Sequence, residues 1–146
     1  MGCILAVDHG TKKTGFAIAD GLRIICEPLD VAHVTGDGPE LLAHIEALCG
    51  ERDVERILVG LPIHMDGVES SRAADVRRFG ERVAAHLAAV GLPAPVSYWD
   101  ERLSTKEADS LLVEAGYTGD ARKSRRDSWS ALVVLRDWLE AGEPAD

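Results

Sequence analysis

Acidic side chains end two apolar segments of the chain. Asp8 closes the segment Cys3–Val7, and Asp100 and Glu101 follow the segment Val96–Trp99. Both segments are typical of buried strands, and open α/β sheets place their ligands at the C-terminal ends of such strands. A single acid there is more often a turn or cap residue beside solvent. Three acids at one predicted sheet edge favour a binding site, because an unpaired charge at that edge is costly.

Asp127 is predicted to join these acids from a helix. Five side chains share one helical stripe, namely Asp127, Ala131, Val134, Leu135 and Trp138. The other interpretation of Asp127 is an acid of the first helical turn that assists Ser124 in starting the helix, which contributes about 0.3 to 1 kcal/mol. If the stripe packs on the sheet, Asp127 points toward Asp8 and Glu101.

Such a cluster of carboxylates has a direct chemical consequence. Like charges held close together repel and raise one another's pKa unless a cation neutralises them. Oxygen ligands with open coordination positions suit Mg²⁺ or Mn²⁺. The sequence therefore predicts a metal site made by Asp8, Glu101 and Asp127, with Asp8 on the central strand between the other two.

Basic side chains near these acids supply the second half of a phosphodiester site. Residues 102–126 hold six basic and four acidic side chains, a net charge of +2 in a chain whose net charge is −9. A run of charge is usually only a solvated face, but this one adjoins the predicted metal site, so we expect it to contact the phosphates of a nucleic acid. Lys12 or Arg102 would offset the charge on the phosphate oxygens. The expected nucleic-acid contacts are Lys12, Lys13, Arg102, Arg122, Lys123, Arg125 and Arg126.

Length and composition indicate one globular domain, residues 1–146. The net charge of −9 excludes a protein that coats nucleic acid or anionic membrane by bulk charge. The three cysteines form no CxxC pair, which suits a reducing cytoplasm. No stretch approaches the roughly 18 apolar residues of a membrane span, and the first residues lack the basic flank of a signal peptide. We therefore expect a cytoplasmic protein that has no membrane partner.

The elements that must bring these residues together are predicted in the order βββαβαβαα. The first three strands form an antiparallel meander, and the later crossovers make the other strands parallel to the first. The predicted strands are 3–8, 16–19, a long third strand of 22–26 and 31–34 interrupted at Pro28, 56–61 and 96–99. The predicted helices are 39–50 from an N1 proline, 71–90, 104–115 from a capping box at Ser104–Glu107, and 124–141 from Ser124. This order describes an α/β fold, a five-stranded mixed sheet with helices on both faces.

Four blocks of the sequence resemble the YqgF/RuvX family of bacterial Holliday junction resolvases, which are also described as nucleases of precursor small-subunit ribosomal RNA. The blocks are Asp8–Gly15, Val59–Pro62 with Met65–Gly67, Asp100–Thr105, and Asp127. The resemblance implies a ribonuclease H-like fold, phosphodiester hydrolysis with two metal ions, and Asp8, Glu101 and Asp127 as the catalytic acids. The substrate it implies is Holliday junction-type DNA, precursor ribosomal RNA, or both.

Three positions depart from the patterns of these relatives. His9 stands where the family often has an apolar or aromatic residue, and His64 stands where Asn is common. The RuvC resolvases, which look like distant relatives, have an acid on the fourth strand where this chain has Gly60. Glu101 would therefore have to replace that acid from the neighbouring strand.

Two other classes of protein fit parts of the sequence. The first block also resembles the phosphate loop of the sugar-kinase and actin superfamily, but those ATPases use two copies of the domain and this chain supplies one. A non-catalytic nucleic-acid-binding or ribosome-assembly factor on the same fold is the second alternative, and the retained acids argue against it. The sequence leaves open the physiological substrate, the choice between endonuclease and exonuclease, and the choice between monomer and homodimer.

Overall fold

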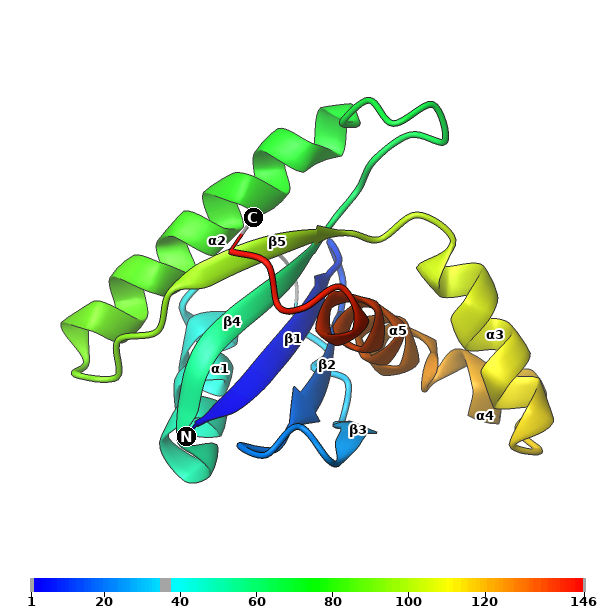
Figure 1. The fold of residues 1–146 in the computed structure, drawn as a ribbon, viewed down its shortest axis with the longest axis horizontal. Helices are drawn as coiled ribbons and strands as arrows, with labels where there is room; N and C mark the ends of the chain where they lie inside the picture. The colour runs from blue at the N-terminus through cyan, green and yellow to red at the C-terminus, as the bar shows by residue number, and fades with distance from the viewer. Residues whose placement is uncertain (1, 35–37, 146) are drawn as a thin grey trace.

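A five-stranded mixed sheet crosses the centre of the computed structural model, which describes residues 2–34 and 38–145 (Figure 1). The strand order is β3-β2-β1-β4-β5, with β1 antiparallel to β2, β2 antiparallel to β3, and β4 parallel to both β1 and β5. The strands are β1 Cys3–His9, β2 Thr14–Ala19, β3 Cys26–Pro28, β4 Val54–Leu61 and β5 Val96–Asp100. The predicted mixed sheet is confirmed, and the three parallel strands end at one edge.

Helices cover both faces of this sheet, as predicted. They are α1 Pro39–Arg52, α2 Ser71–Ala89, α3 Ser104–Glu114, α4 Gly119–Lys123 and α5 Arg126–Glu140. Leu5 and Val7 of β1 are buried in the apolar cluster with α1 and α2, whereas Ile4 and Ala6 are buried in the cluster with α5. Burial on both faces explains why β1 is apolar at consecutive positions. Within the described ranges, no helix is long and apolar enough to cross a membrane.

The third strand is much shorter than predicted. The carboxylate of Asp20 accepts hydrogen bonds from the backbone N–H groups of Ile24 and Ile25 at 2.7 and 2.8 Å, and Arg23 has a left-handed backbone with φ 59°. This turn keeps residues 21–25 out of the sheet, so β3 contains three residues. Ala32 meets β2 only through an isolated bridge to Thr14.

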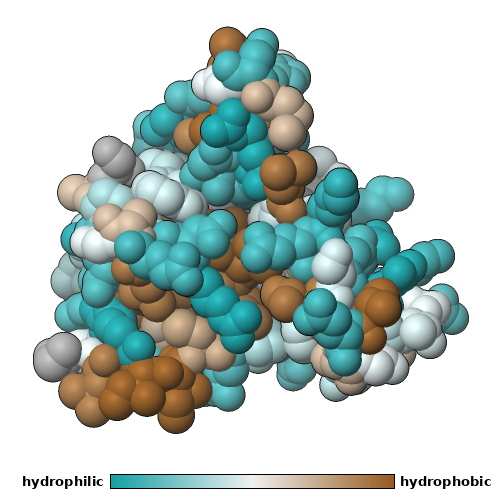
Figure 2. Space-filling model, turned by 45° about the vertical axis from the view of Figure 1, so that its right-hand side comes forward, coloured by the Kyte–Doolittle hydropathy of each residue, from teal (hydrophilic) through white to brown (hydrophobic). Residues whose placement is uncertain are grey.

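This turn leaves apolar side chains in solvent. Leu22, Ile24 and Ile25 are each at least 60% exposed. Figure 2 shows apolar side chains gathered at the lower end of the molecule, the end where Figure 1 draws the connection between β2 and β3.

Local capping signals were less reliable than periodicity. Helix α1 passes the predicted stop at Gly50 and ends before Asp53, which has φ 50°. The predicted capping box does not form, because Leu103 precedes α3 with φ 66° and Ser104 is already helical and buried. Ser124 ends the unpredicted helix α4 and does not start α5, and its hydroxyl donates to the carbonyl of Ala121 at 3.1 Å. Residues 35–37, between the predicted third strand and the predicted first helix, lie outside the described residues.

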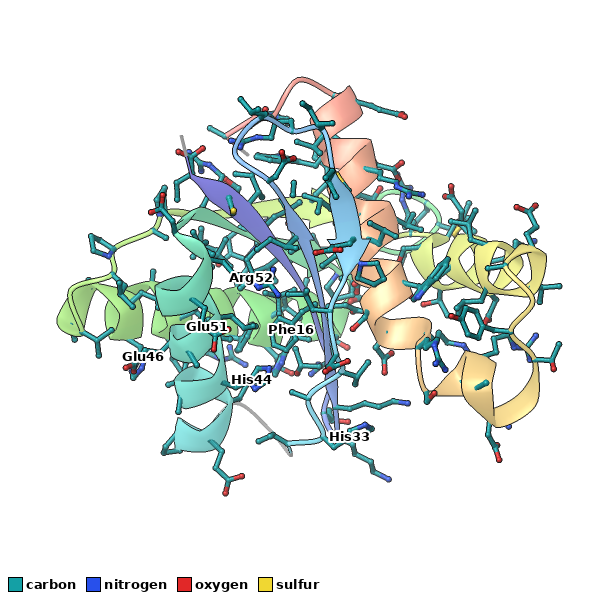
Figure 3. All side chains as sticks on the ribbon, turned by 90° about the horizontal axis from the view of Figure 1, so that it is seen from below. Phe16, His33, His44, Glu46, Glu51 and Arg52 are labelled. Carbon is teal, nitrogen blue, oxygen red and sulfur yellow. The ribbon has the colours of Figure 1, made fainter. Side chains whose placement is uncertain are left out.

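Helix α1 is fixed against the antiparallel side of the sheet. Figure 3 shows His44 directed toward Phe16 of β2, and their ring centres are 5.2 Å apart. At its C-terminal end, Arg52 lies 4.0 Å from the carboxylate of Glu27 in β3. These contacts join α1 to β2 and β3, which are paired with each other and, through β2, with β1.

Candidate active site

Two carboxyl groups from different strands meet at the edge where the parallel strands end. Asp8 is near the end of β1, and Glu101 directly follows β5, with its N–H donating to the carbonyl of Leu61 at 3.1 Å. Their carboxyl groups are close enough to share a hydrogen bond when one of them is protonated, and burial raises the pKa of both. The charge of Glu101 raises the pKa of Asp8 further. The two acids are therefore predisposed to share a proton or to bind a cation.

Glu101 reaches Asp8 by crossing β4 at a glycine. A Cβ atom added to Gly60 would lie 2.8 Å from Oε2 of Glu101 and 3.3 Å from its Cβ. The first distance is shorter than real Cβ atoms allow, so any side chain at position 60 would have to displace the Glu101 carboxylate. The Glu101 carboxylate thus lies where a side chain on β4 would begin, as the comparison with an acid on the fourth strand anticipated.

Asp127 approaches from the other side of Asp8. Gly15, the β2 partner of Asp8, touches the backbone of Asp127 so closely that no Cβ atom would fit there. The N–H of Phe16 donates to the hydroxyl of Ser128 at 3.0 Å, which fastens the start of α5 to β2. The charge of Asp127 also raises the pKa of Asp8, so Asp8 lies electrostatically between the other two acids.

Lys13 holds the side chain of Asp127. Its Nζ is 3.3 Å from Oδ2 of Asp127, an oxygen that is buried and has no hydrogen-bond partner within the described residues. Lys13 is 42% exposed and Asp127 is 25% exposed. The predicted basic contact Lys13 therefore lies at the acids themselves, whereas Lys12 is exposed.

One cation at the site, Arg72, was not predicted from the sequence. It lies in the first turn of α2, and its Nη2 donates to the carbonyl of His9 at 3.0 Å. Its positive charge lowers the pKa of Asp8 and of Glu101, although the effect of burial is larger. No local pattern marks Arg72, because only the packing of α2 on the sheet brings it beside Asp8.

Arg102 does not face these acids. Its Nε donates to Oδ2 of Asp100 at 2.6 Å, and its Nη1 donates weakly to the carbonyls of His64 and Met65 at 3.4 and 3.3 Å. Arg102 therefore ties the loop after β4 to the end of β5. Asp100 is engaged by Arg102, while its neighbour Glu101 turns to Asp8.

The basic segment before Asp127 is partly neutralised. Arg122 and Arg126 lie 3.8 and 2.9 Å from the same carboxylate oxygen of Asp109, and these pairs connect α3 with α4 and α5. Lys123 is exposed, and the guanidinium of Arg125 lies 4.3 Å above the ring of Tyr117.

An open groove leads from the acids toward this segment. Its volume is about 830 Å³, and it extends from Glu101 along α3 past Lys106 to Arg122. The groove therefore connects Glu101 with Arg122, the one residue of the basic segment among its described lining residues.

The two histidines that depart from the family pattern, His9 and His64, lie in different surroundings. The ring of His9 stacks on Phe79 with centres 3.9 Å apart, and its Nδ1 is 3.3 Å from the hydroxyl of Thr14. The exposed His64 lies in the loop after β4, where its backbone N–H donates to the carbonyl of Val68 at 2.7 Å. His9 thus packs the end of β1 against α2, and His64 belongs to a surface loop.

The donor set suits a hard divalent cation. Asp8 and Glu101 present paired carboxyl oxygens whose pKa is raised, and Asp127 adds a buried oxygen without a hydrogen bond. Carboxylate oxygens of this kind are the ligands that Mg²⁺ and Mn²⁺ prefer. Across residues 2–34 and 38–145, no three His, Cys, Asp or Glu side chains already form a metal-binding group. Asp8 and Glu101 are therefore two candidate ligands that already lie side by side, whereas Asp127 forms an ion pair with Lys13.

Solved structures show the class of fold to which this arrangement belongs. RuvC of Thermus thermophilus, in complex with a Holliday junction substrate, matches with a TM-score of 0.58 over 97% of each chain at 13% identity. The Fowlpox virus resolvase, in complex with its substrate Holliday junction DNA, matches with a TM-score of 0.56 over 97% of this chain and 99% of that chain at 11% identity. The fold is that of the RuvC-like, ribonuclease H-type resolvases, as predicted.

The family follows from the sequence comparisons. The family model described as "RuvX: Holliday junction resolvase" matches residues 2–141, so the chain belongs to the RuvX family. A protein of Cereibacter sphaeroides named "Putative pre-16S rRNA nuclease" is 40% identical over 94% of this chain and 86% of its own length. A protein of the same name from Myxococcus xanthus is 34% identical over 97% of this chain and 90% of its own length. The predicted membership is confirmed over nearly the whole chain.

Proposed function

We propose that this protein is a divalent-metal-dependent nuclease that hydrolyses phosphodiester bonds in precursor 16S ribosomal RNA in the cytoplasm. The observation that carries the proposal is the contact of Asp8 with Glu101 across Gly60, with Asp127 beside it. The names of the relatives favour RNA, whereas the resolvases bound to Holliday junctions support the fold alone. Holliday junction-type DNA therefore remains the second substrate to test.

Asp8, Glu101 and Asp127 would hold Mg²⁺ or Mn²⁺ in this proposal. The cation, when bound, makes a water molecule nucleophilic at neutral pH and neutralises charge on the phosphate. Asp8 would be the central ligand of the three, because its carboxylate interacts with both other acids. Lys13 keeps Asp127 neutralised while no cation is present, since its ammonium lies on the oxygen that a cation would take.

The cations around the site orient the nucleic acid. Arg72 is placed to donate hydrogen bonds to non-bridging phosphate oxygens, because its guanidinium already faces Asp8 and Glu101. The groove along α3 would guide the strand, with Lys106 and Arg122 beside it. All three acids come from one chain, so a monomer or a homodimer would have a complete site in each copy.

Cleavage of labelled precursor 16S RNA and of a four-way DNA junction tests the proposal. Wild-type protein should cleave the RNA only with Mg²⁺ or Mn²⁺, and Asp8→Asn should abolish cleavage while binding survives. Asp100→Asn is the matched control, because Asp100 is bound to Arg102 and turned from Asp8. Cleavage by Asp8→Asn at the wild-type rate would refute the assignment. Binding without cleavage by the wild type would favour the assembly-factor alternative.

A further inference from the structure

A second hollow lies at the junction of α4 and α5, beside the candidate active site. Its volume is about 600 Å³, within the roughly 300 to 1,000 Å³ typical of ligand pockets. One wall is the segment 28–33 after β3, and the other contains Tyr117, Arg125 and Trp129. Figure 3 shows His33, which also lines the hollow, beyond the ends of the strands on the side of α4.

Flat side chains dominate one wall of this hollow. The guanidinium of Arg125 lies 4.3 Å above the ring of Tyr117. The rings of Tyr117 and Trp129 are 6.2 Å apart and meet edge to face at 71°. Both rings are only half-buried although they touch each other. Aromatic rings and planar guanidinium groups are the surfaces on which unpaired nucleobases stack.

Polar groups surround these rings. Asp30 and His33 are exposed on the opposite wall, and Ser124 lies next to Arg125. Together they offer donors and acceptors to the edge of a base that stacks on Trp129.

The hollow is rigidly connected to the acids. Its floor includes Ser128, which follows Asp127 and accepts the hydrogen bond from the N–H of Phe16. The bridge between Ala32 and Thr14 holds the wall 28–33 against β2, the direct neighbour of β1. Strands lie about 4.8 Å apart, so this wall is roughly 10 Å from β1, which a short stretch of extended strand can span.

We propose that this hollow binds an unpaired nucleobase of the RNA strand whose backbone lies at Asp8, Glu101 and Asp127, by stacking on Trp129 and Tyr117. The proposal rests on the proposed function for the identity of the strand. It adds a preference for substrates in which a nucleotide near the cleaved bond is single-stranded, because a paired base cannot leave its duplex to stack here without loss of pairing.

Binding of a short single-stranded RNA, measured in a chelator so that nothing is cleaved, tests this site. Fluorescence polarisation of labelled RNA gives the affinity, and tryptophan fluorescence reports stacking. Trp129→Ala and Tyr117→Ala should each weaken binding about 5- to 150-fold, the usual effect of removing one stacked base contact. A base that stacks on Trp129 should quench its fluorescence. Trp129→Phe should therefore bind RNA nearly as tightly as wild type but lose this quenching. Trp99→Phe, which removes a tryptophan outside the hollow, should keep it.

RNA with abasic positions separates base stacking from phosphate binding. Wild type should bind the abasic RNA as weakly as Trp129→Ala binds normal RNA, and Trp129→Ala should show no further loss. Equal wild-type affinity for normal and abasic RNA, or full quenching in Trp129→Phe, would overturn the base site. If these binding results hold while no RNA is cleaved with metal, the base site stands and the proposed nuclease function fails. If metal-dependent cleavage occurs and abasic positions have no effect on binding, the nuclease function stands and the base site fails.

Discussion

Gly60→Ala tests whether the site depends on the gap in β4. The new Cβ atom would lie 2.8 Å from Oε2 of Glu101, whereas comfortable contacts begin near 3.5 Å. The carboxylate must therefore retreat by about 0.7 Å, because Gly60 lies in a buried strand and cannot move as easily as a side-chain end. The retreat moves Glu101 away from Asp8.

The loss of activity should exceed the loss of stability. A misplacement of about 1 Å in a catalytic constellation can cost about 100-fold in rate, so a 0.7 Å shift should lower kcat roughly 10- to 100-fold. The alanine gains about 0.5 to 1 kcal/mol of backbone entropy, which offsets most of the strain against a flexible side chain. The free energy of unfolding should therefore change by no more than about 1 kcal/mol, a shift of about 3 to 5 °C in Tm.

Gly50→Ala is the matched control for this substitution. Gly50 lies in α1, and among the described residues its added Cβ would meet only Leu92 Cδ1, at 3.9 Å. This variant should keep wild-type kcat and gain up to about 1 kcal/mol of stability from helix propensity. Rates of RNA cleavage with saturating Mn²⁺ and thermal melting of all three proteins provide the comparison. Wild-type kcat in Gly60→Ala would refute the reasoning that Glu101 acts through this gap.

The charges at the site lead to three further predictions. The raised pKa of Asp8 means that this residue binds a proton more tightly in the folded state than in the unfolded state, so its contribution to the stability of the metal-free protein should fall as the pH rises above about 4. Asp8→Asn should therefore melt higher than wild type at neutral pH, with the difference shrinking toward pH 4; a lower Tm would contradict this. Arg72→Ala should lower kcat about 100-fold, the cost of one preorganised donor, with Arg72→Lys between it and wild type; full activity in Arg72→Ala would exclude a phosphate contact. Lys123→Gln should reduce the slope of log affinity for RNA against log salt concentration by about 0.7, the contribution of one phosphate contact. Arg126→Gln should mainly lower Tm, because Arg126 pairs with Asp109. An unchanged slope in Lys123→Gln would mean that Lys123 is only a solvated residue.

Local patterns predicted the elements whose burial is continuous or periodic. The apolar segment ending at Asp8 became β1, buried on both faces, and the stripe that begins at Asp127 became the buried face of α5. Sequence patterns failed where the hydrogen bonds of one side chain outweigh the strand propensity of its neighbours. The β-branched Ile24 and Ile25 favour a strand, but two hydrogen bonds to Asp20 hold them in a turn.

Helix starts were decided by contacts between elements. A serine cap contributes only about 1 kcal/mol, so tertiary packing overrides it easily. At Ser104 the backbone is set by the left-handed Leu103 and by the N–H of Ser104 donating to the carbonyl of Glu101. At Ser124 the hydroxyl donates to the carbonyl of Ala121 at the end of the short helix α4, so α5 begins only at Arg126.

The sequence by itself determined the family and the mixed sheet and pointed to three candidate acids, because motif identity and hydrophobic period are local properties of the chain. Only the tertiary structure decided how those acids meet. Glu101 reaches Asp8 because β4 and β5 align in a register that puts Gly60 beneath its carboxylate. Arg72 joins them because α2 packs across the sheet, and no pattern in the chain records that distance. Charge interactions fall off with separation in space, so the electrostatics of the site exist only once the chain has folded.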